Sequence, residues 1–307
     1  WRKLWCPGEE AFRWVHGEAD GLPGIIADLY GDVLSLQVSA AGWYRHIDKV
    51  AAVFRKVRKL SAIVLRNETK HLEKEGMPKE VKLLFGEMPK EPIKIKMGSV
   101  YELVDIEKGQ KTGAYLDVRG VPDMISPLFK GARVLDCFSY QGHFGLHALA
   151  AGASEVVAVE QSQQAIDIAQ KNLEINGLPR KMKWKCGNAF DIMRKMDSDR
   201  ERFDLVIMDP PPFSPAKGQV ESARRGYKEL AVRGFNRIKD GGHMVFLSCS
   251  HAFSREMLLS VLNDAARDAC VSCRIALEIH QPIDHPALSS VPETDYLKGF
   301  VLGVRDQ

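Results

Sequence analysis

The part of the sequence that decides the fold is residues 133–145, which read RVLDCFSYQGHFG. Its first residues, 133–136, are typical of a buried parallel strand, and the polar turn after them carries two glycines. A strand that passes through a glycine-containing turn into a helix is a common ligand-binding arrangement in open α/β sheets. We therefore expect a doubly wound, mostly parallel sheet around this stretch.

The rest of the C-terminal two thirds repeats this alternation of strand and helix patterns. Further buried, parallel strands are predicted at 156–160, 182–186, 205–208 and 243–247. Two late runs, 275–278 and 300–304, predict an antiparallel pair at one edge of the sheet. The fold class expected for residues 96–307 is α/β, a Rossmann-like, doubly wound sheet.

The N-terminal part, residues 1–95, predicts a smaller α+β domain. Its β-like runs lie at 24–28, 33–38 and 62–65. An amphipathic stretch at 47–57 predicts a helix with a basic face. Residues 66–92 are charged and contain three prolines, so they are expected to form a turn-rich connection before a hairpin around Gly98-Ser99. We expect the domain boundary near residue 95.

Composition limits the class of protein. A chain of 307 residues that is 45% hydrophobic can form two domains, and a net charge of +3 is too small to identify a nucleic-acid partner by itself. No apolar run approaches the roughly 20 residues that span a bilayer, and no signal peptide is recognised, so a cytoplasmic protein is expected. The six cysteines are scattered, and the Cys270/Cys273 pair has no partner pair, so neither disulfides nor a metal site is expected.

Polar residues follow three successive predicted strands at the edge where open α/β sheets bind ligands. Asp136 suits a cationic ligand, Glu160 can accept two ribose hydroxyls, and Asn188 with Phe190 can contact an adenine. S-adenosyl-L-methionine, a sulfonium with an amino group and an adenosine, has all these features. Taken singly, the same residues could be a helix cap, a solvated strand end and core. The cofactor-binding residues expected here are Asp136, Cys137, Phe138, Ser139, Gly142, Glu160, Gln161, Asn188, Ala189, Phe190, Asp209 and Pro210.

The next two strands end in residues that suit chemistry on a planar base. Asp209 opens the sequence DPPPF, in which consecutive prolines hold an extended loop and the phenylalanine can stack on a flipped-out ring. Cys249 ends the fifth strand, where a thiolate can add to C6 of a cytosine and make C5 nucleophilic. Asp209 would then contact N3 and the exocyclic amine. His251 is the nearby candidate for removing the C5 proton, although a solvated strand-end histidine is more common.

Seven stretches give the chain a resemblance to a known family. They are VHGEADGLPG at 15–24, QKTGAYLDVR at 110–119, CFSY at 137–140, DPP at 209–211, RGYK at 225–228, SCS at 248–250 and YLKGF at 296–300. Together they resemble the bacterial 23S ribosomal RNA 5-methylcytosine methyltransferases that carry an N-terminal PUA domain. The resemblance covers nearly the whole chain.

The resemblance implies a class I methyltransferase fold, S-adenosyl-L-methionine as cofactor and ribosomal RNA as partner, with Cys249 at the position of the family's nucleophile. It also implies that the cofactor or substrate cleft is lined by Lys111, Tyr115, Asp117 and Arg119. Two departures stand out. The chain is expected to lack the PUA domain, with 1–7 as its remnant, and Pro212 stiffens the loop after Asp-Pro-Pro.

Two other functions fit the same residues. In a methyltransferase acting on the exocyclic nitrogen of guanine or adenine, Asp209 and the proline carbonyls would hold the amino group and Cys249 would be incidental. A non-catalytic RNA-binding protein could also keep this fold. Basic clusters at 55–59 and 180–185, and a third made of Arg224, Arg225 and Lys228, could contact phosphates, the third lying nearest the predicted chemistry. The oligomeric state is left open, with a homodimer as one option.

Overall fold

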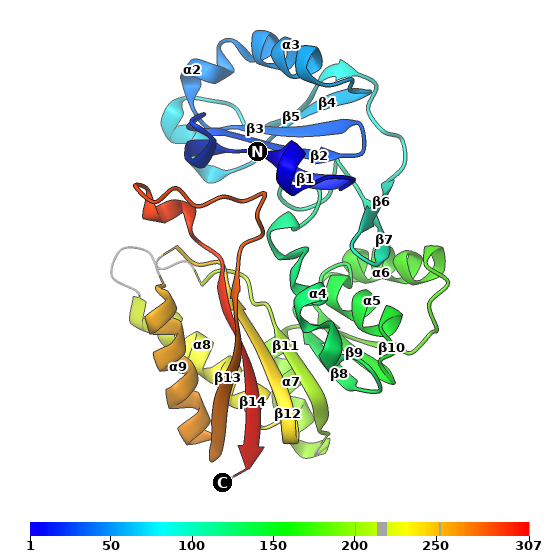
Figure 1. The fold of residues 1–307 in the computed structure, drawn as a ribbon, viewed down its shortest axis with the longest axis vertical. Coiled ribbons are helices and arrows are strands. Elements are labelled where there is room, and N and C mark those ends of the chain that lie inside the picture. Colours follow the sequence, from blue (N-terminus) through cyan, green and yellow to red (C-terminus); the bar gives the residue numbers. More distant parts are fainter. Residues whose placement is uncertain (200, 214–219, 252, 307) are drawn as a thin grey trace. The chain divides into compact units, whose positions relative to one another are not determined.

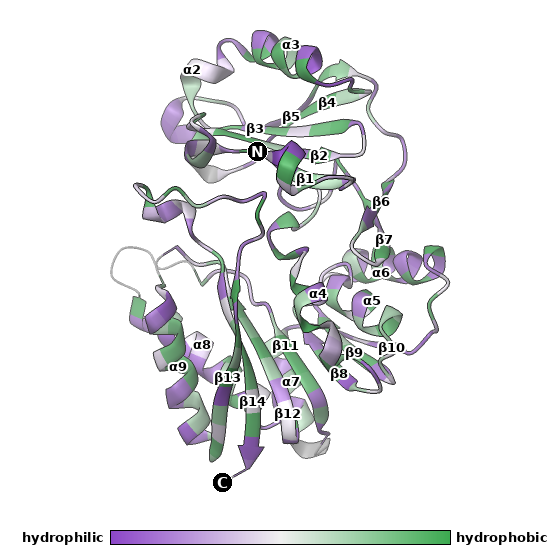
Figure 2. Cartoon of the chain, in the orientation of Figure 1, coloured by the Kyte–Doolittle hydropathy of each residue, from purple (hydrophilic) through white to green (hydrophobic). Residues whose placement is uncertain are grey.

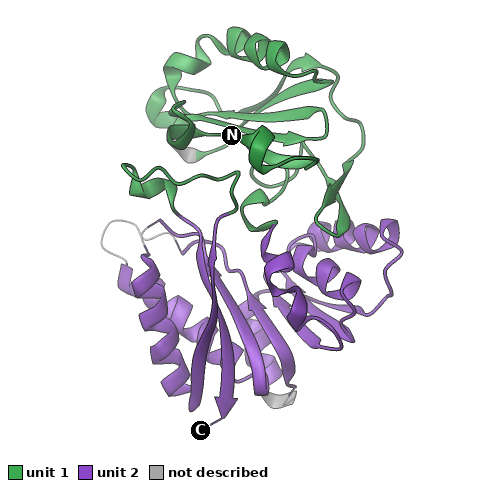
Figure 3. Ribbon diagram, viewed as in Figure 1, with its two compact units in different colours: residues 1–119, 282–295 green, residues 120–281, 296–307 purple. Residues whose placement is uncertain are grey.

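The structure is a computed structural model that describes residues 1–199, 201–213, 220–251 and 253–306, except for the side chains of 70, 71 and 197–199. It divides into two compact units (Figure 3). The smaller unit consists of Trp1–Arg119 and Pro282–Asp295, and the larger unit consists of Gly120–Gln281 and Tyr296–Gln307. Residue 95, at the boundary expected from sequence, lies inside strand β6 of the smaller unit.

The larger unit is built on a seven-stranded sheet with the order β10-β9-β8-β11-β12-β14-β13 (Figure 1). The first five strands in this order are parallel, and β14 is antiparallel to both of its neighbours. The strands are β8 (Arg133–Cys137), β9 (Glu155–Glu160), β10 (Met182–Cys186), β11 (Phe203–Met208), β12 (Ile238–Ser248), β13 (Val271–His280) and β14 (Lys298–Asp306). The predicted Rossmann-like fold class is confirmed, including the antiparallel edge pair.

Helices cover both faces of this sheet. They are α4 (Val121–Ile125), the 3-10 turn η4 (Ser126–Leu128), α5 (His143–Ala150), α6 (Gln163–Ile175), α7 (Ala189–Asp199), α8 (Val220–Phe235) and α9 (Arg255–Asp268). One hydrophobic core is formed by side chains of α7, α8 and α9 together with alternate strand residues such as Leu135 and Cys137. Gly145 of α5 instead packs against Val156, whose side chain points to the opposite face because neighbouring strand residues alternate. Figure 2 shows the strands as largely apolar and α9 as mixed.

The smaller unit has a five-stranded sheet with the order β1-β2-β3-β4-β5. Its strands are β1 (Ala11–His16), β2 (Ile25–Tyr30), β3 (Val33–Val38), β4 (Ala62–Asn67) and β5 (Glu80–Gly86), with the hairpin β6 (Ile93–Met97) and β7 (Val100–Val104). Its helices and 3-10 turns are α1 (Arg2–Trp5), η1 (Gly17–Asp20), α2 (Ala41–Tyr44), α3 (Ile47–Val57), η2 (Lys70–Glu75), η3 (Leu116–Val118) and η5 (Pro292–Thr294). α3 packs on the sheet through Ile47, Ala51 and Phe54, whereas Ile95 of the hairpin belongs to a second core with Tyr30.

Two strands of the smaller unit were not predicted. β1 contains Arg13, which is buried because its guanidinium pairs with Asp28 at 2.8 Å, so the strand lacks a simple apolar alternation. β5 and η2 both lie in 66–92, where a turn-rich connection was expected, and β5 is largely exposed or half-buried. Across the part of the chain that the structure describes, no helix combines the length and apolarity needed to cross a membrane.

Candidate active site at the carboxyl edge of the larger sheet

The turn between β8 and α5 has a strained backbone. Phe138 and Tyr140 have φ angles of 65° and 46°, in the left-handed region that non-glycine residues rarely adopt, and Gly142 has a φ of 85°. Such residues cost about 1–3 kcal/mol each and persist only where the surroundings fix them. The fixing contacts include the Ser139 N–H, which donates to the Val159 carbonyl at 3.1 Å. The backbone of this turn is therefore held in place at the edge of the sheet.

Asp136 is a fully buried carboxyl group beneath this turn. Its Oδ2 accepts a hydrogen bond from the Gly145 N–H at 3.1 Å, while its Oδ1 is buried with no hydrogen-bond partner among the described residues. Burial raises the pKa of Asp136 to about 7, and the charge of Asp209 acts in the same direction. A cationic group beside Oδ1 would favour the ionised carboxylate, so Asp136 is suited to a positively charged ligand.

Glu160 ends β9 and ties two backbone segments together. Its Oε2 accepts from the Tyr140 N–H at 2.9 Å and its Oε1 accepts from the Ser162 N–H at 2.8 Å. The carboxylate is half-buried and each oxygen keeps a further lone pair. Glu160 can thus fix the strained turn and still accept hydroxyl groups from a ligand. Gln161, the next residue, is exposed, and its carbonyl accepts from the Cys186 thiol at 3.8 Å.

Asn188 and Phe190 follow β10, as predicted, but the asparagine side chain caps a helix. Its Oδ1 accepts from the N–H groups of Phe190 at 3.0 Å and Asp191 at 3.4 Å, so it caps the first turn of α7. Asn188 is exposed, Ala189 is buried and Phe190 is half-buried, with its ring centroid 6.3 Å from that of Phe213. Phe190 is the aromatic residue of this segment, and it packs against the core of the larger unit.

Cys137 and Pro210, both predicted to contact the cofactor, are buried. The Cys137 thiol lies in the core with its Sγ 3.8 Å from the Met193 Sδ, and burial raises its pKa. The Cys137 carbonyl accepts from the Asp209 N–H at 3.5 Å, which joins the ends of β8 and β11. Any contact from Cys137 to a ligand would therefore involve its backbone.

Cys249 follows Ser248 at the end of β12, and Ser248 is held by Tyr227. Tyr227, on α8, is fully buried, and its hydroxyl accepts from the Ser248 Oγ at 2.9 Å. Burial raises the pKa of Tyr227 to about 12, and the charged forms of Cys249 and Asp209 act in the same direction. Cys249 itself is half-buried. Cys249 is therefore not sealed in the interior, and it and Asp209 follow neighbouring parallel strands, β12 and β11.

Lys298 holds the segment after Cys249. Although it is only 8% exposed, its Nζ donates to the Ser250 carbonyl at 2.9 Å and to the Phe253 carbonyl at 2.7 Å. The segment is thus fixed from two sides, by Tyr227 before the cysteine and by Lys298 after it. Buried ammonium groups need such acceptors because an uncompensated charge is costly in the interior.

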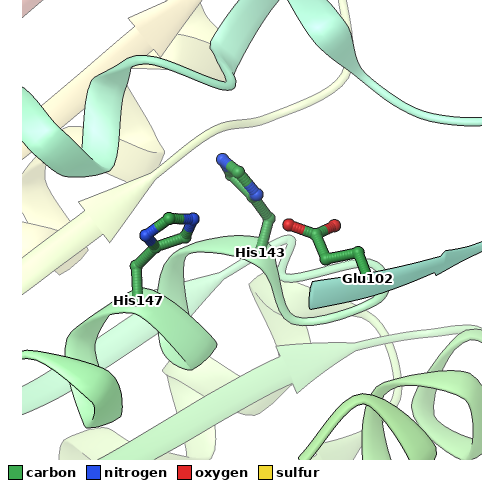
Figure 4. A group of neighbouring side chains, drawn as sticks. All are labelled: Glu102, His143 and His147. Carbon is green, nitrogen blue, oxygen red and sulfur yellow. The ribbon is translucent and has the colours of Figure 1, made fainter. Parts of the chain in front are cut away.

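Three histidines lie on segments next to this edge. His251 is exposed, and its ring centroid is 5.3 Å from that of Tyr296. His143 and His147 project from successive turns of α5, with ring centroids 4.9 Å apart (Figure 4). Glu102, also labelled in Figure 4, belongs to β7 of the smaller unit.

The remaining predicted cofactor residues belong to the smaller unit, where they form ion pairs. The Lys111 Nζ contacts the buried Asp117 carboxylate at 2.7 Å and lies 4.3 Å from the centre of the Tyr115 ring. Arg119 pairs with Glu9 at 2.9 Å and with Asp284 at 3.3 Å.

The structure brings the main predicted residues to one edge because β10, β9, β8, β11 and β12 are parallel neighbours. Asp136, Glu160, Asn188, Asp209 and Cys249 stand at or just after their carboxyl ends. Sequence reasoning missed Tyr227, Ser248 and Lys298 as supporting residues. All three lie in stretches that carried the family resemblance, but no local pattern reveals that a tyrosine or a lysine is buried.

The chain resembles a described family in sequence and solved structures in fold. Residues 118–223 match a family described as conserved hypothetical protein 95. A protein from Streptococcus mutans described as a SAM-dependent methyltransferase has a TM-score of 0.86 at 20% identity, covering 98% of this chain and 77% of its own. A protein described as a methyltransferase, crystallised with SAH, has a TM-score of 0.85 at 21% identity over 98% of this chain and 78% of its own.

Curated proteins share a higher sequence identity with this chain than these solved structures do. A ribosomal RNA large subunit methyltransferase I from Alteromonas mediterranea is 36% identical over 307 residues, which is 99% of this chain and 77% of that protein. One from Aeromonas hydrophila is 37% identical over 300 residues, 97% of this chain and 76% of that protein. The chain belongs to the family of ribosomal RNA large subunit methyltransferase I.

Proposed function

We propose that this protein transfers a methyl group from S-adenosyl-L-methionine to C5 of a cytosine in large-subunit ribosomal RNA. The observation that carries the proposal is that the half-buried Cys249 follows β12 and Asp209 follows the neighbouring parallel strand β11, at the sheet edge that also holds Asp136. The relatives, named for methylation of large-subunit ribosomal RNA, support the substrate class.

The chain's own groups fit S-adenosyl-L-methionine. The buried Oδ1 of Asp136 has no hydrogen-bond partner among the described residues and suits the ammonium group, and Glu160 suits the ribose hydroxyls. Phe190 offers a ring to the adenine. A related fold crystallised with SAH supports this assignment.

In the proposed reaction the Cys249 thiolate attacks C6 of the cytosine, so a sulfur–carbon bond forms and electron density moves from the C5–C6 double bond. Asp209 shares a proton with N3, where negative charge would otherwise develop. The bound cofactor supplies an electrophilic methyl group, which C5 accepts. Loss of the C5 proton to a base then restores the C5–C6 double bond and expels the thiolate. His251 is the candidate base.

Tyr227 and Lys298 keep the thiol at this position. Tyr227 accepts from Ser248, the residue before the nucleophile, and Lys298 holds the carbonyl of the residue after it. Neither needs to touch the substrate. Their fixed contacts reduce the freedom of the segment, which favours a nucleophile that must approach one carbon atom.

The decisive experiment replaces the thiol. Cys249→Ala should abolish methyl transfer to ribosomal RNA and leave S-adenosyl-L-methionine binding, measured by calorimetry, within about twofold of the unmodified protein. Cys273→Ala, which removes another half-buried thiol, is the matched control and should stay active. RNA containing 5-fluorocytidine should be trapped covalently, because C5 carries no removable proton.

Two other outcomes would contradict the proposed function. Substantial transfer by Cys249→Ala would support direct methylation of an exocyclic nitrogen, with the loop at 209–213 holding the amino group. Failure of the unmodified protein to bind S-adenosyl-L-methionine would support a non-catalytic RNA-binding protein.

A further inference from the structure

The outer surface of α2–α3 in the smaller unit carries most of the chain's excess positive charge. Residues 45–59 contain six Lys or Arg and a single acidic residue, Asp48, which gives a net charge of +5. The whole chain has +3, so the rest of the sequence sums to −2. We call the cationic residues of this surface the α3 basic face; they are Arg45, Lys49, Arg55, Lys56, Arg58 and Lys59, and all six are exposed.

The fold directs this charge to solvent. α3 buries Ile47, Ala51 and Phe54 against the sheet, and Lys49 and Lys56, seven residues apart, lie two turns from each other on the opposite side. Figure 1 shows α3 along one face of the five-stranded sheet. No ion pair involves any of the six cations among the described side chains, which in the smaller unit are all except those of 70 and 71.

One cation of this face is also held in place. The Arg55 guanidinium lies 3.6 Å from the centre of the Phe85 ring, on β5. Two apolar side chains stand among the charges, since Val53 is 58% exposed and Val57 is 65% exposed. A surface of unpaired cations around small apolar patches suits a polyanion that also presents sugar and base surfaces, as RNA does.

The second basic cluster differs because acidic neighbours neutralise it. Arg180 pairs with Glu174 at 3.6 Å, and Lys185 pairs with Glu201 at 3.6 Å. Lys183 pairs with Glu155. Three of the four cations in this cluster therefore have an acidic partner, although Glu155 and Glu201 also pair with Arg133.

The third cluster, which lies nearest the chemistry in sequence, is also largely paired. Arg224 contacts the Asp264 carboxylate at 2.6 Å and Lys228 contacts Asp268 at 2.8 Å, which links α8 to α9. Arg225 remains exposed. Of the three clusters found in the sequence, the first is therefore the one whose charge the fold leaves open.

We propose that the α3 basic face binds the phosphate backbone of the ribosomal RNA substrate, outside the nucleotide that is methylated. This inference rests on the proposed function. Lysine and arginine contacts to phosphates release bound counterions, so affinity falls with salt by a slope of about 0.7 per contact for single strands. Such contacts carry no base information, so they strengthen binding to any RNA and leave the choice of nucleotide to the catalytic unit.

The test removes three lysines that face solvent. The variant Lys49→Gln, Lys56→Gln, Lys59→Gln should raise the KM for transcribed 23S ribosomal RNA at least about tenfold at low salt and leave kcat and cofactor affinity unchanged. The salt slope for binding a single-stranded fragment of that RNA should fall by about 2. The control Lys181→Gln, Lys183→Gln, Lys185→Gln removes the same charge from the neutralised cluster and should change both much less.

The outcomes separate this inference from the proposed function. Equal KM values and salt slopes for the two triple variants would overturn the role of the α3 basic face. If the unmodified protein binds RNA but methylates none, the proposed function fails, while the salt slopes still decide the inference. Loss of binding to anionic lipid vesicles in the first variant, with RNA binding unchanged, would assign the face to a membrane surface instead.

Discussion

The substitution Asp136→Asn should stabilise the free protein at pH 8 and greatly weaken cofactor binding. Burial raises the pKa of this carboxyl from 3.8 to about 7, a difference of about three pH units. One unit corresponds to about 1.4 kcal/mol, so keeping Asp136 ionised costs the folded state about 4 kcal/mol. The cost is tolerable for a protein that binds a cation at this position, because the bound cation favours the ionised form.

Proton binding by Asp136 determines how the stability of the folded chain changes with pH. Between pH 4 and pH 7 the folded chain holds a proton that the unfolded chain has released, so the stabilising effect of protonation is lost as pH rises toward about 7. Asparagine does not titrate and keeps an oxygen for the Gly145 N–H, but it buries an amide group without a partner, at a cost of about 1–3 kcal/mol. The net gain at pH 8 is therefore about 1–3 kcal/mol, and it should disappear by pH 5.

Urea unfolding of the cofactor-free protein at both pH values, followed by circular dichroism, measures this difference. The matched control is Asp204→Asn on β11. Burial alone would raise the pKa of Asp204, but hydrogen bonds from the Lys239 ammonium and the Arg133 N–H lower it, so its replacement should destabilise the protein at pH 8. If Asp136→Asn is equally destabilised at pH 5 and pH 8, or binds S-adenosyl-L-methionine as tightly as the unmodified protein, the reasoning about Asp136 is refuted.

Two further substitutions test the support of Cys249. Lys298→Met should lower methyl transfer more than cofactor binding. It should also reduce the free energy of unfolding by about 2–5 kcal/mol, because two buried carbonyls lose their donor. An unchanged transfer rate in a destabilised variant would make the lysine purely structural. Tyr227→Phe should lower the free energy of unfolding in urea by about 1–3 kcal/mol, since the Ser248 hydroxyl loses its acceptor. It should also slow alkylation of Cys249 by iodoacetamide. Alkylation at the rate of the unmodified protein would show that the hydroxyl does not position the thiol.

The sheet of the larger unit could be predicted because its signals are local. β10 matches its prediction of 182–186 at both ends, and β8 and β9 differ from theirs by one residue each. β12 was predicted as 243–247 but begins at Ile238, because Gly241 and Gly242 interrupt the apolar pattern of its first half. Strand ends carry the candidate site, so predicting parallel strands also places Asp136 and Glu160 on a common edge.

The supporting residues could not be predicted because their roles depend on contacts distant in sequence. Ser248 meets Tyr227 across 21 residues, and Lys298 meets Ser250 across 48. Nothing local to the stretch 296–300 marks its lysine as buried, since lysine is among the residues most often exposed. The same reason hid the pairing of Arg224 and Lys228 with α9, which changes how the basic clusters rank as RNA contacts.

The stretch at 110–119 shows how a family resemblance can combine structural and functional residues. Within the smaller unit, the buried Asp117 pairs with the exposed Lys111, and Arg119 pairs with the buried Asp284, a residue 165 positions later. The Asp284 carboxylate also accepts from the Arg13 N–H at 2.9 Å, so the returning segment 282–295 is fastened to β1. Removing one member of a buried ion pair costs about 3–5 kcal/mol, because its partner is left uncompensated. Ion pairs within the smaller unit therefore explain the acid at Asp117 and the arginine at Arg119 without any contact to a ligand.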